Sequence, residues 1–150
     1  MSIENISNLI NVISNEFKEN KKLIKLKELI NSYNGTDYKE YVNDDCDSYY
    51  RNKVYSNDMF EIYIITWKGN KESKIHDHPE NGCILHVLEG ELKEEIYNSD
   101  LEHIKTNIAI TKSTSYIEGN KILHKIINNT NQNTVTLHIY SPPNHKIKCY

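Results

Sequence analysis

Hydrophobic side chains in the first part of the chain recur at steps of three and four residues, the spacing of one helix face. In residues 2–18 this stripe consists of Ile3, Ile6, Ile10, Ile13 and Phe17. The stripe predicts an amphipathic helix over residues 2–18. The same spacing returns in residues 20–33 with Leu23, Leu26, Leu29 and Ile30, and Gly35 stands just beyond, where helices commonly stop. A second helix is therefore predicted over 20–33, followed by a short helix or turn at 38–42.

Near residue 50 the pattern changes to short runs rich in Tyr, Ile, Val and Thr. Gly, Asn, Asp or Ser separates the runs, which is typical of an antiparallel all-β region. Strands are predicted over residues 50–56, 59–67, 74–77, 83–89, 91–98, 102–105, 113–117, 123–128 and 134–140. Glu89-Gly90-Glu91 predicts a tight hairpin turn. This arrangement favours a sandwich or a barrel that is at least partly closed to protect its edges.

The length of 150 residues suits one domain with one core. We expect a single domain over residues 1–150, with a helical cover over about 1–45 and a β-barrel over about 49–143. No internal repeat, low-complexity tract or Pro-rich linker divides the chain. The helices are expected to cover a sheet and to carry no chemistry.

Charge argues against two classes of partner. Charged residues make up 26% of the chain with a net charge of −3, so no basic surface is available for nucleic acid or anionic lipid. No stretch approaches the roughly 18 apolar residues of a membrane span, and residues 1–20 lack the basic start and apolar block of a signal peptide. We therefore expect a soluble, cytoplasmic protein that binds neither nucleic acid nor membrane.

The three cysteines, Cys46, Cys83 and Cys149, lie far apart and show no paired spacing such as C-x-x-C. An odd number of widely separated cysteines argues against a disulfide framework and against a cysteine zinc site. Any chemistry of these thiols must come from their individual surroundings.

The most informative triplet is His76-Asp77-His78. Residues two apart on an extended strand point to the same face, so both imidazoles can reach one metal ion. Taken alone, the pair is weak evidence, and two solvent-facing histidines are the default interpretation. The residues that follow change this balance.

Four residues separate His78 from Cys83, and six residues separate Cys83 from Gly90. This spacing resembles the first motif of the cupin superfamily, with Cys83 in the place of the usual glutamate. Further along, His124 and Asn128 resemble the second cupin motif, whose histidine completes a metal site. Gly119 of that motif is present and its expected proline is missing.

A cysteine in place of that glutamate resembles the cysteine dioxygenases, and three further motifs extend the likeness. They are Leu88-Glu89-Gly90, His138-Ile139-Tyr140-Ser141-Pro142-Pro143 and Tyr49-Tyr50-Arg51-Asn52. The likeness runs from about residue 49 to 143. It implies a mainly β fold, a cupin (jelly-roll-like) β-barrel with N-terminal α-helices packed on it.

The resemblance also implies roles for particular residues. His76, His78 and His124 would hold iron(II), Fe(2+), as a neutral three-histidine face that leaves up to three positions open for a substrate thiolate and O₂. Arg51, the sole arginine, would bind the carboxylate of cysteine, because its planar guanidinium can form two parallel hydrogen bonds. Tyr49 would line the substrate cavity.

Cys83 and Tyr140 would lie beside the metal, where the family forms a thioether bond between the cysteine sulfur and the tyrosine ring. His138 alternates with Tyr140 and would hydrogen-bond the phenol. Thr136 continues the alternation where the family is expected to carry serine, so the hydroxyl is kept. Without the resemblance, Cys83 is a small buried hydrophobe and Tyr140 one of 11 tyrosines in a core.

The remaining candidates are weaker. Trp67 is expected to wall the pocket or the core. His145 is expected to be exposed, and His86 and His103 are expected at the surface. Family members continue past the Pro-Pro pair with further strand, whereas this chain stops at Tyr150, so a shorter or more open barrel edge is expected.

The predicted activity is oxidation of free cysteine by O₂ to cysteine sulfinic acid, catalysed by a monomer acting on small-molecule substrates. Three alternatives stay open. The first is a dioxygenase for another small thiol, such as 3-mercaptopropionate or cysteamine. The second is a non-catalytic metal-binding cupin that acts as a sensor, and the third is a zinc-dependent isomerase or hydrolase on the same barrel.

Overall fold

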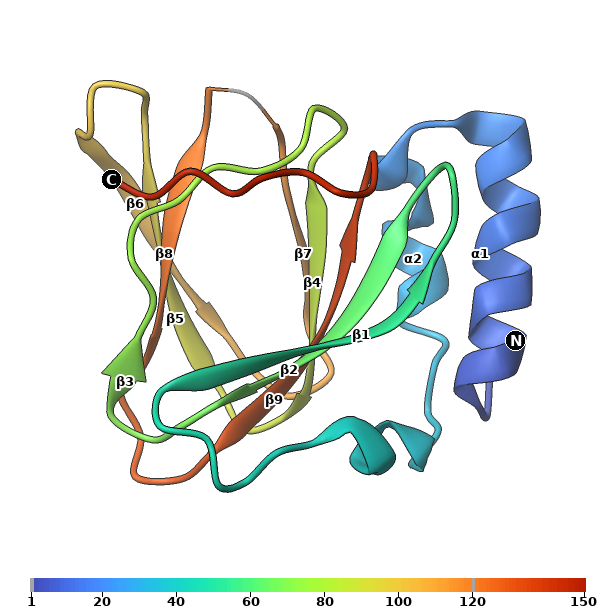
Figure 1. The fold of residues 1–150 in the computed structure, drawn as a ribbon, viewed down its shortest axis with the longest axis horizontal. Helices are drawn as coiled ribbons and strands as arrows, with labels where there is room; N and C mark the ends of the chain where they lie inside the picture. Colours follow the sequence, from blue (N-terminus) through green and yellow to red (C-terminus); the bar gives the residue numbers. More distant parts are fainter. Residues whose placement is uncertain (1, 120) are drawn as a thin grey trace.

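Two antiparallel sheets face each other in the computed structural model, which describes residues 2–119 and 121–150 (Figure 1). One sheet has the strand order β1-β2-β9-β4-β7 and the other β3-β8-β5-β6. The strands are β1 (Tyr49–Ser56), β2 (Glu61–Trp67), β3 (Lys71–Glu72), β4 (Cys83–Glu89), β5 (Leu92–Tyr97), β6 (His103–Ala109), β7 (Thr114–Ile117), β8 (Leu123–Asn128) and β9 (Thr134–Tyr140). The space between the two sheets is the interior of a barrel.

The helices come first in the chain. They are α1 (Ile6–Asn20), the 3-10 turn η1 (Leu23–Leu26), α2 (Lys27–Ile30) and a second 3-10 turn, η2 (Asp37–Tyr41). Asn5 caps α1, because its side chain accepts a 2.8 Å hydrogen bond from the Asn8 backbone N–H. Lys21 ends the helix in the left-handed conformation, with φ of 55°. Among the described residues, no helix has the length and apolar character needed to cross a membrane.

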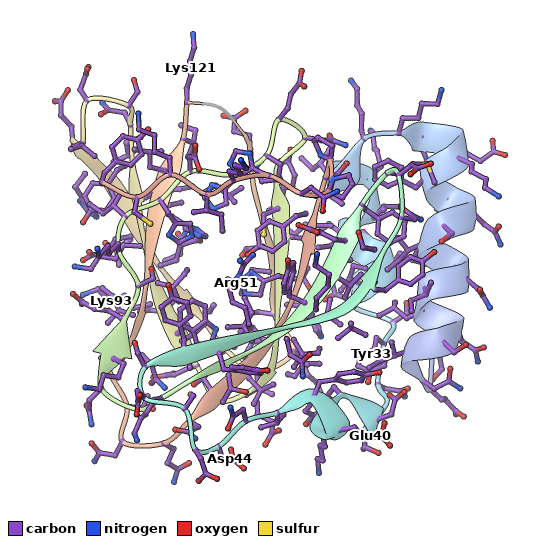
Figure 2. The ribbon with its side chains drawn as sticks, in the orientation of Figure 1. Tyr33, Glu40, Asp44, Arg51, Lys93 and Lys121 are labelled. Atoms are coloured by element: carbon purple, nitrogen blue, oxygen red, sulfur yellow. The ribbon has the colours of Figure 1, made fainter. Side chains whose placement is uncertain are left out.

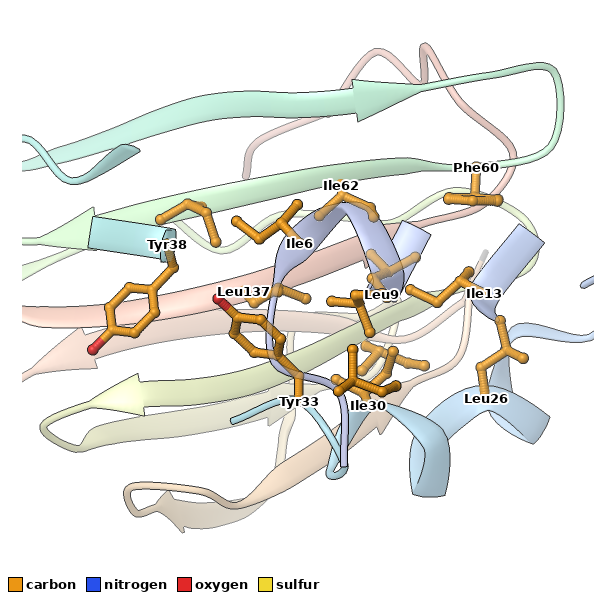
Figure 3. Packing of buried hydrophobic residues seen from close by; sticks show 14 of the residues in the cluster. Ile6, Leu9, Ile13, Leu26, Ile30, Tyr33, Tyr38, Phe60, Ile62 and Leu137 are labelled. Carbon is orange, nitrogen blue, oxygen red and sulfur yellow. The ribbon is translucent and has the colours of Figure 1, made fainter. Parts of the chain in front are cut away.

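The helices cover the outer face of the β1-β2-β9-β4-β7 sheet. Figure 3 shows Ile6, Leu9 and Ile13 of α1 packed close to Ile62 and Leu137 of the sheet. All five side chains are buried. Because the same sheet also faces the barrel interior, β2, β4 and β9 are enclosed on both sides and almost all of their residues are buried.

This double burial sorts the residues of β9 by face. Val135, Leu137 and Ile139 join the hydrophobic cluster under the helices. The alternate residues, which include Thr136, His138 and Tyr140, point into the barrel, where His138 and Tyr140 line a pocket. The apolar face of β9 therefore packs on the helices, and its polar face is left for the barrel interior.

Several predicted boundaries are confirmed, including strands 83–89, 123–128 and 134–140. Other predictions are wrong. Glu89-Gly90-Glu91 is not a hairpin turn, because it connects β4 of one sheet to β5 of the other. The helix predicted over 20–33 is split into η1 and α2, because Lys21 ends the first helix and a parallel bridge from Tyr33 to Ile3 returns the chain to extended structure. The strand predicted over 74–77 does not form as a regular strand, because β3 ends at Glu72 and is followed by isolated bridges from His76 to His124 and to Cys149.

Candidate active site

Three imidazoles from two distant segments meet inside the barrel. Nε2 of His124, on β8, lies 2.9 Å from Nε2 of His78 and 3.0 Å from Nε2 of His76. The ligand atoms of all three residues lie within 4.8 Å of one another. His78 and His124 are buried, and His76 is half-buried at the edge of the pocket. The structure thus brings together the three predicted metal ligands.

Backbone pairing holds two of these ligands opposite each other. The His76 N–H donates to the His124 carbonyl at 2.9 Å, and the His124 N–H donates to the His76 carbonyl at 3.1 Å. A residue pair that exchanges both bonds places its side chains on the same face of the ladder. The isolated bridge therefore fixes His76 relative to His124, whereas the predicted strand concerned His76 relative to His78.

The hydrogen bonds made by Nδ1 of His76 and of His124 determine which ring nitrogen carries the hydrogen and which presents a lone pair. His76 Nδ1 lies 2.8 Å from the Lys74 carbonyl, which only accepts, so Nδ1 carries the hydrogen. His124 Nδ1 lies 2.7 Å from Oε2 of Glu94, and an ionised carboxylate has the same effect. The Nε2 atoms of His76 and His124 then present lone pairs to each other across 3.0 Å. Two lone pairs at that distance repel, and a cation between them removes the repulsion.

The nitrogen separations also bear on the geometry of such a cation. Two imidazole nitrogens bound at about 2.1 Å to one ion are about 3.0 Å apart at a 90° angle and about 3.4 Å apart at a tetrahedral angle. The observed separations of 2.9 and 3.0 Å match the right angle. The spacing of His124 to each of the other two histidines therefore suits right-angle, octahedral coordination better than a tetrahedral zinc site, and the ligand atoms of His76 and His78 lie within 4.8 Å of each other.

The electrostatics of the pocket favour neutral imidazoles. Burial lowers the pKa of His76, and it lowers the pKa of His78 and of His124 well below the usual value, with the neighbouring imidazoles adding to the effect. A metal ligand must be deprotonated at the coordinating nitrogen. These histidines are thus in the ligand form at neutral pH without a proton having to leave first.

Beside the three histidines lies a pocket that contains the predicted substrate-binding residues. Its lining includes Tyr49 and Arg51 of β1, Trp67 of β2, and His138 and Tyr140 of β9. Figure 2 shows Arg51 directed into the space between the two sheets. Tyr49 is 41% exposed, and its ring lies 5.0 Å from that of Trp67, so it forms the outer wall.

Arg51 is held by aromatic rings and has no acidic partner. Its guanidinium carbon lies 4.3 Å from the ring centroid of Tyr63 and 5.4 Å from that of Tyr140. Within residues 2–119 and 121–150, no carboxylate oxygen lies within 4.0 Å of its nitrogens. A half-buried guanidinium without an internal counterion is suited to an anionic ligand.

A chain of hydrogen bonds leads across the barrel to Tyr140. The Trp67 indole N–H donates to Oγ1 of Thr136 at 2.9 Å, and this hydroxyl lies 2.9 Å from Nε2 of His138. Nδ1 of His138 lies 3.1 Å from the Tyr140 phenol oxygen. When the Thr136 hydroxyl donates to His138, the His138 Nδ1–H donates to the phenol, and the phenol proton points elsewhere. Burial raises the pKa of Tyr140 well above its usual value, so the phenol stays protonated.

Cys83 lies directly across from Tyr140 in the β4–β9 ladder. Side chains of directly opposed residues have Cβ atoms about 4.5–5.5 Å apart, within reach of a bond between sulfur and an aromatic ring. Both residues are buried, and Sγ of Cys83 lies 3.7 Å from Nδ1 of His138. Burial raises the pKa of the Cys83 thiol, so it is a thiol at neutral pH.

Comparison with known proteins shows which protein family the chain resembles. The family model for cysteine dioxygenase type I matches residues 2–150. The chain belongs to this family. Cysteine dioxygenase type 1 of Danio rerio is 28% identical over 95% of this chain and 77% of its own length. The Rattus norvegicus protein is 36% identical over 63% of this chain and 52% of its own length, and the Homo sapiens protein 32% over 72% and 58%.

The chain thus spans about half to three quarters of these cysteine dioxygenases. Solved structures resemble it in fold. A protein with a double-stranded β-helix domain from Klebsiella pneumoniae has a TM-score of 0.62 at 16% identity, over 74% of this chain and 91% of its own. A Bacillus subtilis oxalate decarboxylase has a TM-score of 0.53 at 15% identity, over 61% of this chain and 24% of its own. The predicted mainly β cupin barrel with N-terminal helices is confirmed.

Three histidines outside the metal-ligand set test the weaker predictions for this cysteine dioxygenase family member. His103 is exposed, as predicted. His86 is not a surface residue, because it lies on the helix-covered face of β4 together with Ile84, is 2% exposed and bonds Thr114 Oγ1 at 2.7 Å. His145 is half-buried instead of exposed, because Nε2 is 2.9 Å from Oδ1 of Asp77.

The C-terminal segment was not recognised from the sequence as part of the pocket. Ile147 and Cys149 line it, and Cys149 forms an isolated bridge with His76. Oδ1 of Asp77 accepts a hydrogen bond from the Lys148 backbone N–H at 2.8 Å. This bond holds the C-terminal segment beside the histidines that flank Asp77. In Figure 1 this segment crosses one end of the barrel. The predicted openness of the barrel edge is therefore reduced by residues 144–150 themselves.

Glu94 was also missed, although its signal was present. In residues 92–96, Leu92, Glu94 and Ile96 alternate with Lys93 and Glu95, which places Glu94 on the apolar, inward face. A carboxylate on such a face needs a partner, and that partner is His124.

A larger groove of about 630 Å³ lies near the β4–β5 connection, away from the histidines. Glu91 is its one ionisable lining residue, so the groove brings no comparable group of side chains together.

Proposed function

We propose that this chain is a non-haem iron(II) cysteine dioxygenase that oxidises L-cysteine with O₂ to cysteine sulfinic acid. The observation that carries the proposal is the meeting of the three histidine Nε2 atoms beside a pocket that contains the Tyr140 phenol and the Arg51 guanidinium, which has no carboxylate partner among the described residues. Membership of the cysteine dioxygenase type I family supports it. The reaction, the substrate and the metal are proposals, as are a monomeric state and a cytoplasmic location.

His76, His78 and His124 are the proposed metal ligands. Iron(II) held there would supply the activation of O₂ and the oxidation of sulfur. The near-right-angle nitrogen spacing favours a metal of octahedral preference over a tetrahedral structural zinc. With no carboxylate among the three ligands, the site has both the space and the charge to accept an anionic thiolate.

Arg51 is the proposed carboxylate-binding residue. Its fork of donors suits two parallel hydrogen bonds to a carboxylate, and the rings of Tyr63 and Tyr140 limit its movement. Tyr49 and Trp67 form the wall on the same side. This favours cysteine over cysteamine, which lacks a carboxylate. Arg51 does not distinguish cysteine from 3-mercaptopropionate, because both carry a carboxylate. These two thiols differ in the amine of cysteine, so their specificity constants must be compared directly.

Tyr140 is the proposed proton donor and hydrogen-bonding residue next to the substrate. Its raised pKa keeps the phenol protonated. His138, whose pKa burial lowers well below the usual value, stays neutral and orients the phenol oxygen through Nδ1. Thr136 and Trp67 hold His138 in turn, so the phenol is held by a rigid chain of buried groups.

We further propose that Cys83 and Tyr140 become joined by a thioether bond during turnover. A carbon–sulfur bond forms while the thiol hydrogen and one ring hydrogen are lost, with O₂ as the oxidant. Intact mass of protein incubated with iron and cysteine should fall by the mass of two hydrogens. The Cys83→Ser variant is the control, and an unchanged mass of the parent protein after full turnover would reject the cross-link.

The test of the proposed reaction is anaerobic reconstitution with iron(II), followed by oxygen-electrode assays and product analysis. Cysteine sulfinic acid formed with matching O₂ uptake is expected. Metal binding without thiol-dependent O₂ uptake would favour the non-catalytic cupin, and an activity that persists under nitrogen would favour an isomerase or hydrolase. A higher specificity constant for 3-mercaptopropionate or cysteamine would overturn the substrate assignment.

A further inference from the structure

A buried carboxylate lies directly behind one of the proposed metal ligands. Glu94 is on β5, is 5% exposed, and pairs in register with Ile126 of β8. His124 is two residues from Ile126 on that strand, so Glu94 and His124 are diagonal neighbours on the inward face. Diagonal neighbours in a sheet are within reach of long side chains.

The contacts of this carboxylate are few and specific. Oε2 lies 2.7 Å from Nδ1 of His124, and Oε1 accepts a 3.5 Å hydrogen bond from the Asn107 side chain. Within residues 2–119 and 121–150, His124 is the one basic side chain within ion-pair distance of Glu94. A buried carboxylate is costly unless it is paired, so the burial of Glu94 is linked to His124.

We propose that Glu94 is a positioning residue of the metal centre: it holds the hydrogen of His124 on Nδ1, aims Nε2 at the metal, and places a negative charge behind an otherwise uncharged ligand set. The inference rests on the metal-binding part of the proposed function, and it is independent of the substrate and the reaction. Carboxylates in this position raise the basicity of the imidazole and restrict its ring orientation.

The three-histidine centre is therefore not electrically neutral beyond its first contacts. No carboxylate is among the three proposed ligands. The Glu94 carboxylate instead lies behind one of them, hydrogen-bonded to Nδ1 of His124. Substrate and O₂ then keep their space at the metal, while the higher oxidation state of the metal is stabilised by the charge of Glu94.

Three variants separate charge, orientation and position. Glu94→Gln keeps an oxygen acceptor for the His124 Nδ1–H and removes the charge. Glu94→Met removes both, with a similar side-chain length. Glu95→Gln is the matched control, because Glu95 is the next residue on β5, faces the other side of the sheet and accepts a 2.9 Å bond from the Tyr97 hydroxyl.

Binding of Co(II) to the metal-free protein is the first measurement, by calorimetry and by the absorption bands of bound Co(II). Loss of a partner behind a histidine ligand weakens metal binding about 10- to 100-fold. We expect about 10-fold weaker binding for Glu94→Gln and about 100-fold for Glu94→Met, with Glu95→Gln unchanged. Wild-type affinity in Glu94→Met, or equal weakening in Glu95→Gln, would overturn the proposal.

A second measurement needs no variant. In the zinc-loaded wild-type chain, nitrogen-15 NMR should show His124 protonated at Nδ1 and coordinated through Nε2, with a slowly exchanging Nδ1 proton far downfield. Coordination through Nδ1, or a rapidly exchanging proton, would contradict the role of Glu94 even if the variants fail to fold. A merely structural Glu94 would not alter the Co(II) bands or the potential of the iron couple in Glu94→Gln.

These outcomes are distinguishable from failure of the proposed function. If Glu94 variants weaken Co(II) binding but the iron-loaded protein takes up no O₂ with any thiol, the inference stands and the dioxygenase proposal fails. If the iron-loaded protein oxidises cysteine and Glu94→Met binds Co(II) like the wild type, the dioxygenase proposal stands and the inference about Glu94 fails.

Discussion

Removal of the Arg51 side chain is the sharpest test of how this pocket recognises its substrate. Arg51 is half-buried on β1, lies against the Tyr63 ring, and has no carboxylate partner among the described residues. Arg51→Ala removes both donors that would bind a substrate carboxylate. Arg51→Lys keeps the charge, but loses the planar fork and its fit against the aromatic ring.

The magnitude follows from the bonds that would be lost. Hydrogen bonds to charged groups contribute about 1.5–3 kcal/mol each, and the two bonds of a bidentate pair are not fully additive, so about 3–4 kcal/mol is expected for Arg51→Ala. At about 1.4 kcal/mol per tenfold, kcat/KM for cysteine should fall by about 100- to 1000-fold. Arg51→Lys should retain one bond and lose about 2 kcal/mol, or about 30-fold.

The assay is O₂ uptake by the iron-loaded protein with cysteine and with cysteamine, which lacks the carboxylate. Cysteine activity should collapse in Arg51→Ala, while kcat/KM for cysteamine should stay within about threefold of the wild-type value. Lys53→Ala is the control, because Lys53 is a second cation two residues along β1 with its side chain 45% exposed. Equal losses with both thiols would show that Arg51 supports the pocket structure instead of binding a carboxylate.

Three further predictions concern stability and catalysis. Burial lowers the pKa of His86 to about 4, and the unfolded chain takes up the proton near pH 6.5, so stability should fall as pH drops through this range. By pH 5 His86 alone contributes about 2 kcal/mol to this loss, and His86→Gln should lack that share. Equal losses of unfolding free energy from about pH 7.5 to 5 in both proteins would contradict this. Leu137→Ala empties a fully buried position and should cost about 2–5 kcal/mol in urea unfolding, whereas Ile24→Ala, at a position 48% exposed, should stay within about 0.5 kcal/mol. Equal costs would refute this packing argument. Tyr140→Phe should lower kcat with cysteine about 100-fold without changing Co(II) affinity, and an unchanged kcat would remove the phenol from the proposed chemistry.

Local patterns in the sequence predicted much of the fold. The short runs of strand-favouring residues at 83–89, 123–128 and 134–140 placed three strands at their observed bounds. The hydrophobic stripe of residues 2–18 predicted α1, which is displaced to Ile6–Asn20 because Asn5 supplies the cap. These successes share a cause, since helix and strand periods are properties of neighbouring residues and survive any tertiary arrangement.

The proposed ligand set depended on motif spacing, and the roles assigned to its residues stay predictions. Their spatial arrangement is a tertiary fact. His76 and His78 lie outside any regular strand, and the backbone bridge to His124 on β8 aligns His76. Nothing local to His76 specifies this bridge, because its partner is 48 residues away.

By itself, the sequence determined the order of the elements, the apolar faces and the candidate chemistry, because these depend on the spacing of residues along the chain. The tertiary structure alone decided that β9 turns its apolar face to the helices and its polar face to the barrel, that His86 is buried, and that Glu94 lies behind His124. It also decided that residues 147–149 border the pocket. Each of these depends on which strand lies opposite and on the pairing register, which long-range packing selects and local sequence does not encode.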